Sequence, residues 1–222
     1  MAPTVEPLTF ALPKGRILKQ ALPLFERAGF CFASALGSGD SRELQFTTTA
    51  GHRLLLVKPV DVATYVEYGI ADIGIAGLDS LEEDPRDLYR PLDLRLGACR
   101  LAIAEPVSRP VVMRPGIRVR VATKYPHLAQ RHYRARGIQP EIIKLFGSVE
   151  LGPITGLSDQ IVDLVESGET LRQNNLREVE TILEVSSRLI VHPASLKLKR
   201  VAIRSTIHAI AEAMKPASTG SP

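Results

Sequence analysis

The sequence contains no tryptophan, and only 5% of its 222 residues are aromatic. Proteins that bind single-stranded nucleic acid stack successive bases on aromatic side chains. The net charge is only +4, from 28 basic and 24 acidic residues, so the chain also lacks the dense basic face that such proteins present. The composition therefore disfavours a nucleic-acid-binding role, while a small polyanionic substrate would suit this charge balance.

Cysteine, targeting signals and long apolar runs are equally scarce. The two cysteines, Cys31 and Cys99, lack metal-ligand spacing and predict buried thiols in a reducing compartment. Residues 1–7 contain neither a basic region nor an apolar core, so we expect no secretory signal. No apolar run approaches the length of a membrane span. These features predict a soluble, cytoplasmic protein.

Short apolar strands alternate with helical patterns along the chain, which is typical of an α/β protein. Pro23 lies within the first helical pattern and is expected to kink or break it. We expect strands at residues 8–12, 54–57, 71–76, 118–122, 141–145, 161–165, 178–184 and 188–191, and helices at 17–28, 60–68, 126–137, from 149 onward and at 195–214.

No linker marks a domain boundary. We expect the chain to leave a first lobe near residues 94–99 and to return near 181–185. Lobe I would then be residues 8–97 plus 181–214, lobe II residues 98–180, and a ligand cleft would lie between them. The ends of the chain, 1–7 and 215–222, lack apolar anchors and are expected to be flexible tails.

The most informative polar pattern lies in residues 158–171. A short buried strand at 161–165 has Asp159 and Asp163 at and near its start, and it leads into the turn at 166–170, which contains glycine and two hydroxyls. Backbone N–H groups in such a turn, at the start of a helix, can bind a phosphate monoester. The carboxylates can accept hydrogen bonds from sugar hydroxyls or hold magnesium. The pattern suggests a phosphoribosyl donor.

Two other strand–turn–helix junctions carry polar residues. Lys14, Gly15 and Arg16 combine two cations with a glycine at a helix start, which favours binding of a pyrophosphate or triphosphate. Glu150 opens a helix after the strand at 141–145, and Asp79 is a possible helix cap or ligand contact. No spacing suggests a nucleophile–base pair, so electrostatic positioning of two anionic substrates is the better hypothesis.

Taken together, these segments resemble the ATP phosphoribosyltransferase family. The matching stretches follow one another in order from residue 8 to about residue 200, and the ordered set is far more specific than any one of them. They are residues 11–16, 58–62 with 65–67, 71–77, 121–126, 147–150 and 158–171.

The resemblance implies a two-lobed fold like that of the type II periplasmic binding proteins. It also implies transfer of the 5-phosphoribosyl group from phosphoribosyl pyrophosphate (PRPP) to N1 of ATP, with Mg2+, in the first step of histidine biosynthesis. Carried over by position, the expected PRPP-binding residues are Asp159, Asp163, Glu166, Ser167, Gly168, Glu169, Thr170 and Leu171. The expected ATP-binding residues are Lys14, Gly15, Arg16, Lys58 and Asp79, and the expected catalytic residues are Lys14, Arg16, Glu150 and Asp163, with Asp163 also a candidate metal ligand.

Length adds a second expectation. The chain leaves no room for the regulatory domain of long family members, so it is similar to the short-form catalytic subunits. Those depend on a regulatory protein related to histidyl-tRNA synthetase, which implies a homodimer alone and a hetero-oligomer with that partner.

Some positions depart from the pattern of the family. Lys58 stands where arginine is usual, Phe146 replaces a polar residue, and Ser167 replaces threonine. Glu169 adds negative charge beside the expected phosphate site and should therefore point away from the ligand.

Two rival interpretations remain open from the residues themselves. A purine-salvage phosphoribosyltransferase has a similar phosphate turn, although those enzymes usually place two adjacent acids before it. A two-lobed solute-binding module without catalysis is the alternative from another class, and a test for pyrophosphate release separates it from an enzyme.

Overall fold

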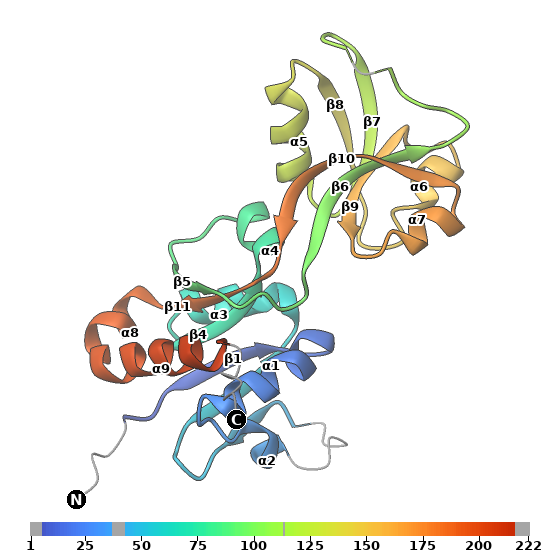
Figure 1. Ribbon diagram of the computed structural model, residues 1–222. Helices are drawn as coiled ribbons and strands as arrows, with labels where there is room; N and C mark the ends of the chain where they lie inside the picture. Colours follow the sequence, from blue (N-terminus) through green and yellow to red (C-terminus); the bar gives the residue numbers. More distant parts are fainter. Residues whose placement is uncertain (1–5, 37–42, 113, 216–222) are drawn as a thin grey trace, which may run out of the picture. The chain divides into compact units, whose positions relative to one another are not determined.

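The computed structural model of the chain describes residues 6–36, 43–112 and 114–215. The chain divides into two compact units (Figure 1). Unit 1 comprises residues 1–81, 86–97 and 186–222, and unit 2 comprises 82–85 and 98–185. Unit 2 continues through Val185, the last residue of the segment 181–185 near which the return is expected. The predictions of flexible tails at 1–5 and 216–222 lie outside the described residues.

Unit 1 is built on a six-stranded sheet in the order β2-β3-β1-β4-β11-β5. The central strand β1 pairs in parallel with β3 and β4, whereas β11 runs antiparallel to both β4 and β5. The strands are β1 (Thr9–Pro13), β2 (Gln45–Thr47), β3 (Arg53–Val57), β4 (Ile73–Gly77), β5 (Tyr89–Asp93) and β11 (Ser187–Val191).

Helices cover both faces of this sheet, and alternate residues of β1 face opposite sides, as the pleat requires. Phe10 packs in one cluster with Phe25 and Ile203, and Ala11 packs in the other with Val62 and Val66. The helices of unit 1 are α1 (Arg16–Arg27), α2 (Phe32–Leu36), a short 3-10 turn at Pro59–Asp61, α3 (Val62–Glu67), α4 (Leu78–Glu83), α8 (Pro193–Leu198) and α9 (Arg200–Ala213); the last residues of α4 belong to unit 2.

Unit 2 is a five-stranded sheet in the order β10-β6-β9-β7-β8. Strand β7 pairs in parallel with β8 and β9, and β6 runs antiparallel to β9 and β10. Helix α5 lies on the opposite side of β9 from α6 and α7 (Figure 1). The elements are β6 (Cys99–Pro106), β7 (Arg118–Thr123), α5 (Pro126–Ala135), β8 (Gln139–Lys144), α6 (Leu151–Ile154), β9 (Gln160–Val165), α7 (Glu169–Gln173) and β10 (Leu176–Val185).

Three expectations were wrong in detail. Helix α1 continues through Pro23, so the expected alternative of a break there is wrong. The single helix expected at 195–214 is two helices, α8 and α9, which meet at Lys199. The thiols are not buried, because Cys31 is exposed and Cys99 is partly exposed. Within the described residues, no helix is long and apolar enough to cross a membrane.

Lys199 leaves helical geometry where it joins a buried polar cluster around Asp72. The Asp72 carboxylate accepts hydrogen bonds from the Thr9 N–H at 2.8 Å, the Ser195 hydroxyl at 2.7 Å and the Lys199 ammonium at 2.9 Å. Burial alone would raise the pKa of Asp72, but these donors outweigh it and hold the pKa below its ordinary value. The cluster ties β1 and the start of β4 to helix α8.

We expect Asp72→Ala to lower the free energy of unfolding by about 3 kcal/mol, because it leaves buried donors unpaired. A carboxyl whose pKa is depressed by folding stabilises the fold above its unfolded pKa of about 3.9, and the contribution disappears as pH falls through the folded value. The stability gap between wild type and Asp72→Asn should therefore be full at neutral pH and shrink below about pH 4. Urea unfolding at several pH values measures this difference in the free energy of unfolding. The exposed Asp87→Ala is the control. Equal losses of stability in Asp72→Ala and Asp87→Ala would contradict the assignment.

Candidate functional site

The polar residues of unit 2 gather at one edge of its sheet. Because β7, β8 and β9 are mutually parallel, their carboxyl ends meet at that edge. The turn at residues 166–170 follows β9, Glu150 lies in the segment after β8, and Lys124 follows β7. The sequence places each polar turn after a strand, and the parallel pairing brings the turns together.

The turn after β9 forms a hollow of about 250 Å³, lined by Glu150 and residues 163–171. Gly168 is the N-cap of α7 in the left-handed conformation, with φ 75°, and has no side chain to cap the helix. The Ser167 hydroxyl accepts the Glu169 N–H at 3.3 Å. Uncapped backbone N–H groups around such a turn suit a phosphate group.

Glu169 lines the hollow, but its carboxylate is paired with side chains of α7. Its carboxylate accepts hydrogen bonds from the Arg172 guanidinium, at 3.2 Å from Nε, and from the Gln173 amide at 3.0 Å. Arg172 lowers the pKa of Glu169, with Gln173 adding to the effect. The negative charge that departs from the family pattern is therefore compensated along α7.

Asp163 lies on β9 at the floor of the hollow. Burial raises the pKa of Asp163, while the Leu164 N–H and the Lys124 ammonium oppose the increase and the Glu150 carboxylate adds to it. A half-buried carboxylate beside a phosphate-binding turn can accept hydrogen bonds from sugar hydroxyls or bind a cation.

Asp159, another residue expected to bind PRPP, does not line this hollow. It precedes β9, about 13 Å from Asp163 at the usual rise of a strand. Its carboxylate forms an ion pair with Arg120 at 2.7 Å and also accepts the Arg120 N–H at 3.0 Å. Asp159 therefore joins the starts of β7 and β9.

The other predicted residues gather at the carboxyl edge of the unit 1 sheet. Pro13 pairs with Val57, so Lys14 and Lys58 follow neighbouring parallel strands. Asp79 lies in the first turn of α4, directly after β4, and is nearly buried. Gly15 precedes α1 with φ 93° and ψ −142°, a conformation open to glycine alone, and Arg16 begins the helix. Three cations and one carboxylate thus share one edge.

Lys124, within the matching stretch 121–126, is not among the predicted site residues. Thr123 ends β7 and pairs with Val162, so Lys124 follows a residue that lies beside the one preceding Asp163. The rule that placed Asp163 and Glu150, a polar residue at the carboxyl end of a parallel strand, also selects Lys124.

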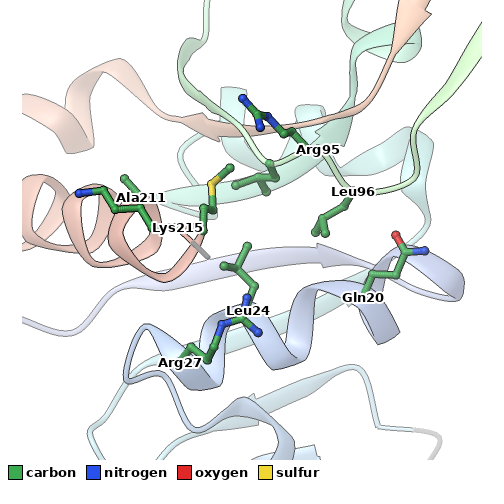
Figure 2. A pocket seen from close by; sticks show the side chains of 9 residues that line it. Gln20, Leu24, Arg27, Arg95, Leu96, Ala211 and Lys215 are labelled. Carbon is green, nitrogen blue, oxygen red and sulfur yellow. The ribbon is translucent and has the colours of Figure 1, made fainter. Parts of the chain in front are cut away.

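A second hollow, of about 410 Å³, lies within unit 1 between α1, the segment after β5 and the end of α9. Figure 2 shows Leu24 and Leu96 beside it, with the cationic side chains of Arg27, Arg95 and Lys215 around them. No predicted site residue lines this hollow, so it is separate from the polar edge of unit 1.

A family model described as "HisG: ATP phosphoribosyltransferase" matches residues 58–215. The chain belongs to this family. An ATP phosphoribosyltransferase of Acidithiobacillus ferrooxidans is 49% identical over 213 residues, covering 94% of this chain and 98% of the relative. Another, of Syntrophotalea carbinolica, is 50% identical over 203 residues, covering 90% and 92%. Family members are transferases of histidine biosynthesis, and their reaction, between PRPP and ATP, is the first step of that pathway.

Solved structures agree with the family and the fold. An ATP phosphoribosyl transferase (HisG:HisZ) complex from Thermotoga maritima matches with a TM-score of 0.79 and 34% identity, covering 93% of this chain and 98% of that chain. The periplasmic aliphatic sulphonate binding protein of Escherichia coli matches with a TM-score of 0.57 and 14% identity, covering 94% and 68%. That likeness concerns the fold alone, and it confirms the expected architecture of the ATP phosphoribosyltransferase.

Gly168 offers a test of the phosphate turn. We expect Gly168→Val to weaken PRPP binding at least about five-fold, because a side chain in the left-handed conformation costs about 1–2 kcal/mol. Gly168→Asn should be milder, since asparagine tolerates this conformation. The control is Gly116→Val, which imposes the same strain at φ 82°, with open space around it, on a turn outside the hollow. Calorimetric titration with PRPP measures the effect, and equal losses of affinity in the two valine variants would contradict it.

Proposed function

We propose that this chain transfers the 5-phosphoribosyl group of PRPP to N1 of ATP, releasing pyrophosphate and forming N1-(5-phosphoribosyl)-ATP. The family match over residues 58–215 carries this proposal. The polar hollow after β9 supports it, because it combines a phosphate-binding turn with a half-buried carboxylate.

The chemistry needs little acid–base help. The lone pair of adenine N1 forms the new bond to C1 of the ribose, while the bond from C1 to the pyrophosphate oxygen breaks and pyrophosphate leaves with that electron pair. N1 carries no proton that must be removed. The work of the protein is to align N1 with C1 and to stabilise the charge that develops in an oxocarbenium-like transition state.

We assign PRPP to unit 2. The backbone N–H groups and hydroxyls of residues 166–171 would hold the 5-phosphate, and Asp163 would accept hydrogen bonds from the ribose diol. Glu150 lines the same hollow and would contact the ribose. The placement of these groups at one sheet edge supports the assignment.

We assign the triphosphate of ATP to the cationic edge of unit 1. Lys14, Arg16 and Lys58 supply positive charge there, and Gly15 exposes its N–H at the start of α1. Asp79 would accept a hydrogen bond from the nucleotide. Lysine at position 58 acts as a point charge, so it retains attraction for phosphate without the bidentate geometry of arginine.

Magnesium fits this arrangement as an ion held mainly through the substrate. Among the described residues, no group of three His, Cys, Asp or Glu side chains is placed to hold a metal. Proteins commonly bind Mg2+ through one or two carboxylates plus substrate phosphates, and Asp163 in its polar hollow could be that carboxylate. When bound, the ion neutralises charge on the pyrophosphate leaving group.

We also propose a regulatory partner related to histidyl-tRNA synthetase, with the chain as a homodimer in its absence. The likeness to the catalytic chain of a HisG:HisZ complex supports this proposal.

We expect the purified chain to release pyrophosphate only when ATP, PRPP and Mg2+ are all present, and the cognate partner to increase the rate. A coupled phosphate assay measures it. No release with the assembled complex would favour a solute-binding role, and release with a free purine base in place of ATP would favour the salvage reaction.

The role of Asp163 is open to a direct test. We expect Asp163→Asn to reduce turnover about 100-fold, because it removes the charge that faces the ribose in the transition state. Asp159→Asn is the matched control: its carboxylate is paired with Arg120 outside the hollow, so this variant should lose stability and keep its turnover. Near-normal turnover of Asp163→Asn would contradict the assignment.

A further inference from the structure

The hollow after β9 is lined by negative charge. Four carboxylate residues line it, Glu150, Asp163, Glu166 and Glu169, and no cationic side chain is among the described residues that do. PRPP carries a 5-phosphate and a pyrophosphate, so its binding here requires positive charge. This inference rests on the proposed function.

The nearby arginines are already engaged. Arg172 donates to the Glu169 carboxylate, and Arg100 donates to the Glu178 carboxylate and, at 3.1 Å, to the Glu166 carbonyl oxygen. Both therefore compensate charges of unit 2 itself. A side-chain cation beside the hollow would add to the charge that magnesium supplies with the substrate.

Lys124 is placed to supply that charge. Strands β7 and β9 are parallel, with Ala122 opposite Ile161, and both residues pack in one apolar cluster. Thr123, the last residue of β7, pairs with Val162, so Lys124 in the bend that follows β7 lies next in the chain to a residue beside the one that precedes Asp163. The attraction between the Lys124 ammonium and the Asp163 carboxylate agrees with this placement, and the Lys124 side chain is exposed.

The chemistry of PRPP specifies which group such a cation meets. The pyrophosphate is attached to C1, and C1 is bonded to C2, which carries one hydroxyl of the diol. A cation beside the carboxylate that holds the diol is thus beside the pyrophosphate, whereas the 5-phosphate lies at the other end of the sugar. We propose that Lys124 binds the pyrophosphate group of PRPP.

In this role Lys124 neutralises charge on the leaving group as the bond to C1 breaks. A lysine suits the task, because its ammonium is a compact charge on a flexible stem and can follow pyrophosphate as it departs. Asp163 then binds the ribose diol, and Lys124 binds the pyrophosphate attached at the neighbouring carbon.

Lys144 provides a matched control. It ends β8, beside β7 on the same sheet, and pairs with Thr123, which pairs with Val162, so it faces the side of the sheet opposite Asp163. Its ammonium lies 5.6 Å from the centre of the Phe146 ring. Removing this charge alters the net charge of unit 2 equally, without touching the face that carries Asp163.

The experiment compares Lys124→Met, Lys124→Arg and Lys144→Met by calorimetric titration in the presence of Mg2+ and without ATP. Loss of a charge-assisted hydrogen bond should weaken pyrophosphate binding by Lys124→Met about ten-fold or more. Ribose 5-phosphate should bind Lys124→Met nearly as well as it binds wild type, because ribose 5-phosphate lacks the pyrophosphate group that Lys124 contacts. Lys124→Arg should recover most of the affinity, and Lys144→Met should match wild type.

Two results would overturn the inference. Unchanged pyrophosphate affinity of Lys124→Met would place the ammonium away from that group, and equal weakening for ribose 5-phosphate would indicate a general change of the hollow. Urea unfolding of each variant identifies a folding defect, in which case Lys124→Gln replaces the methionine variant. The proposed function fails separately, through absence of ATP-dependent pyrophosphate release by the wild type.

Discussion

Parallel strand pairing is the constraint on which the functional architecture depends. Since β7, β8 and β9 run in the same direction, the turns that follow them are forced to one edge of the unit 2 sheet. Strands β1, β3 and β4 impose the same condition in unit 1. A single polar turn is common in proteins, and only the neighbouring turns at the same sheet edge combine with it into a binding site. The strand order therefore determines which substrate groups lie side by side.

The carboxyl edges of the two sheets offer different groups to an anion. Unit 1 offers the cationic side chains Lys14, Arg16 and Lys58, whereas the hollow of unit 2 offers backbone N–H groups amid carboxylates. Carboxylates suit a sugar diol, and uncapped N–H groups suit a single phosphate.

Local patterns in the sequence predicted most strands, the phosphate turn and the polar turn beside α1. They failed where long-range contacts decide the outcome. Asp159 has the spacing of a ligand, but only the fold shows that Arg120, far away in sequence, occupies its carboxylate. Strand β6 was missed because its partners β9 and β10 are distant in the chain. The break at Lys199 likewise follows from Asp72, which no helical pattern includes.

The position of β11 has a consequence for the order in which the chain folds during synthesis. β11 lies between β4 and β5 in the unit 1 sheet, yet it is made after all of unit 2. As the ribosome releases the chain, β5 therefore waits without its sheet partner while residues 98–185 already contain every strand of unit 2. Unit 2 can complete its sheet first. The sheet of unit 1 is complete only after β11 is synthesised, and the hydrogen bond from α8 to Asp72 forms after that. A chain that ended before β11 would contain every strand of unit 2, but β4 and β5 of unit 1 would lack the strand that lies between them.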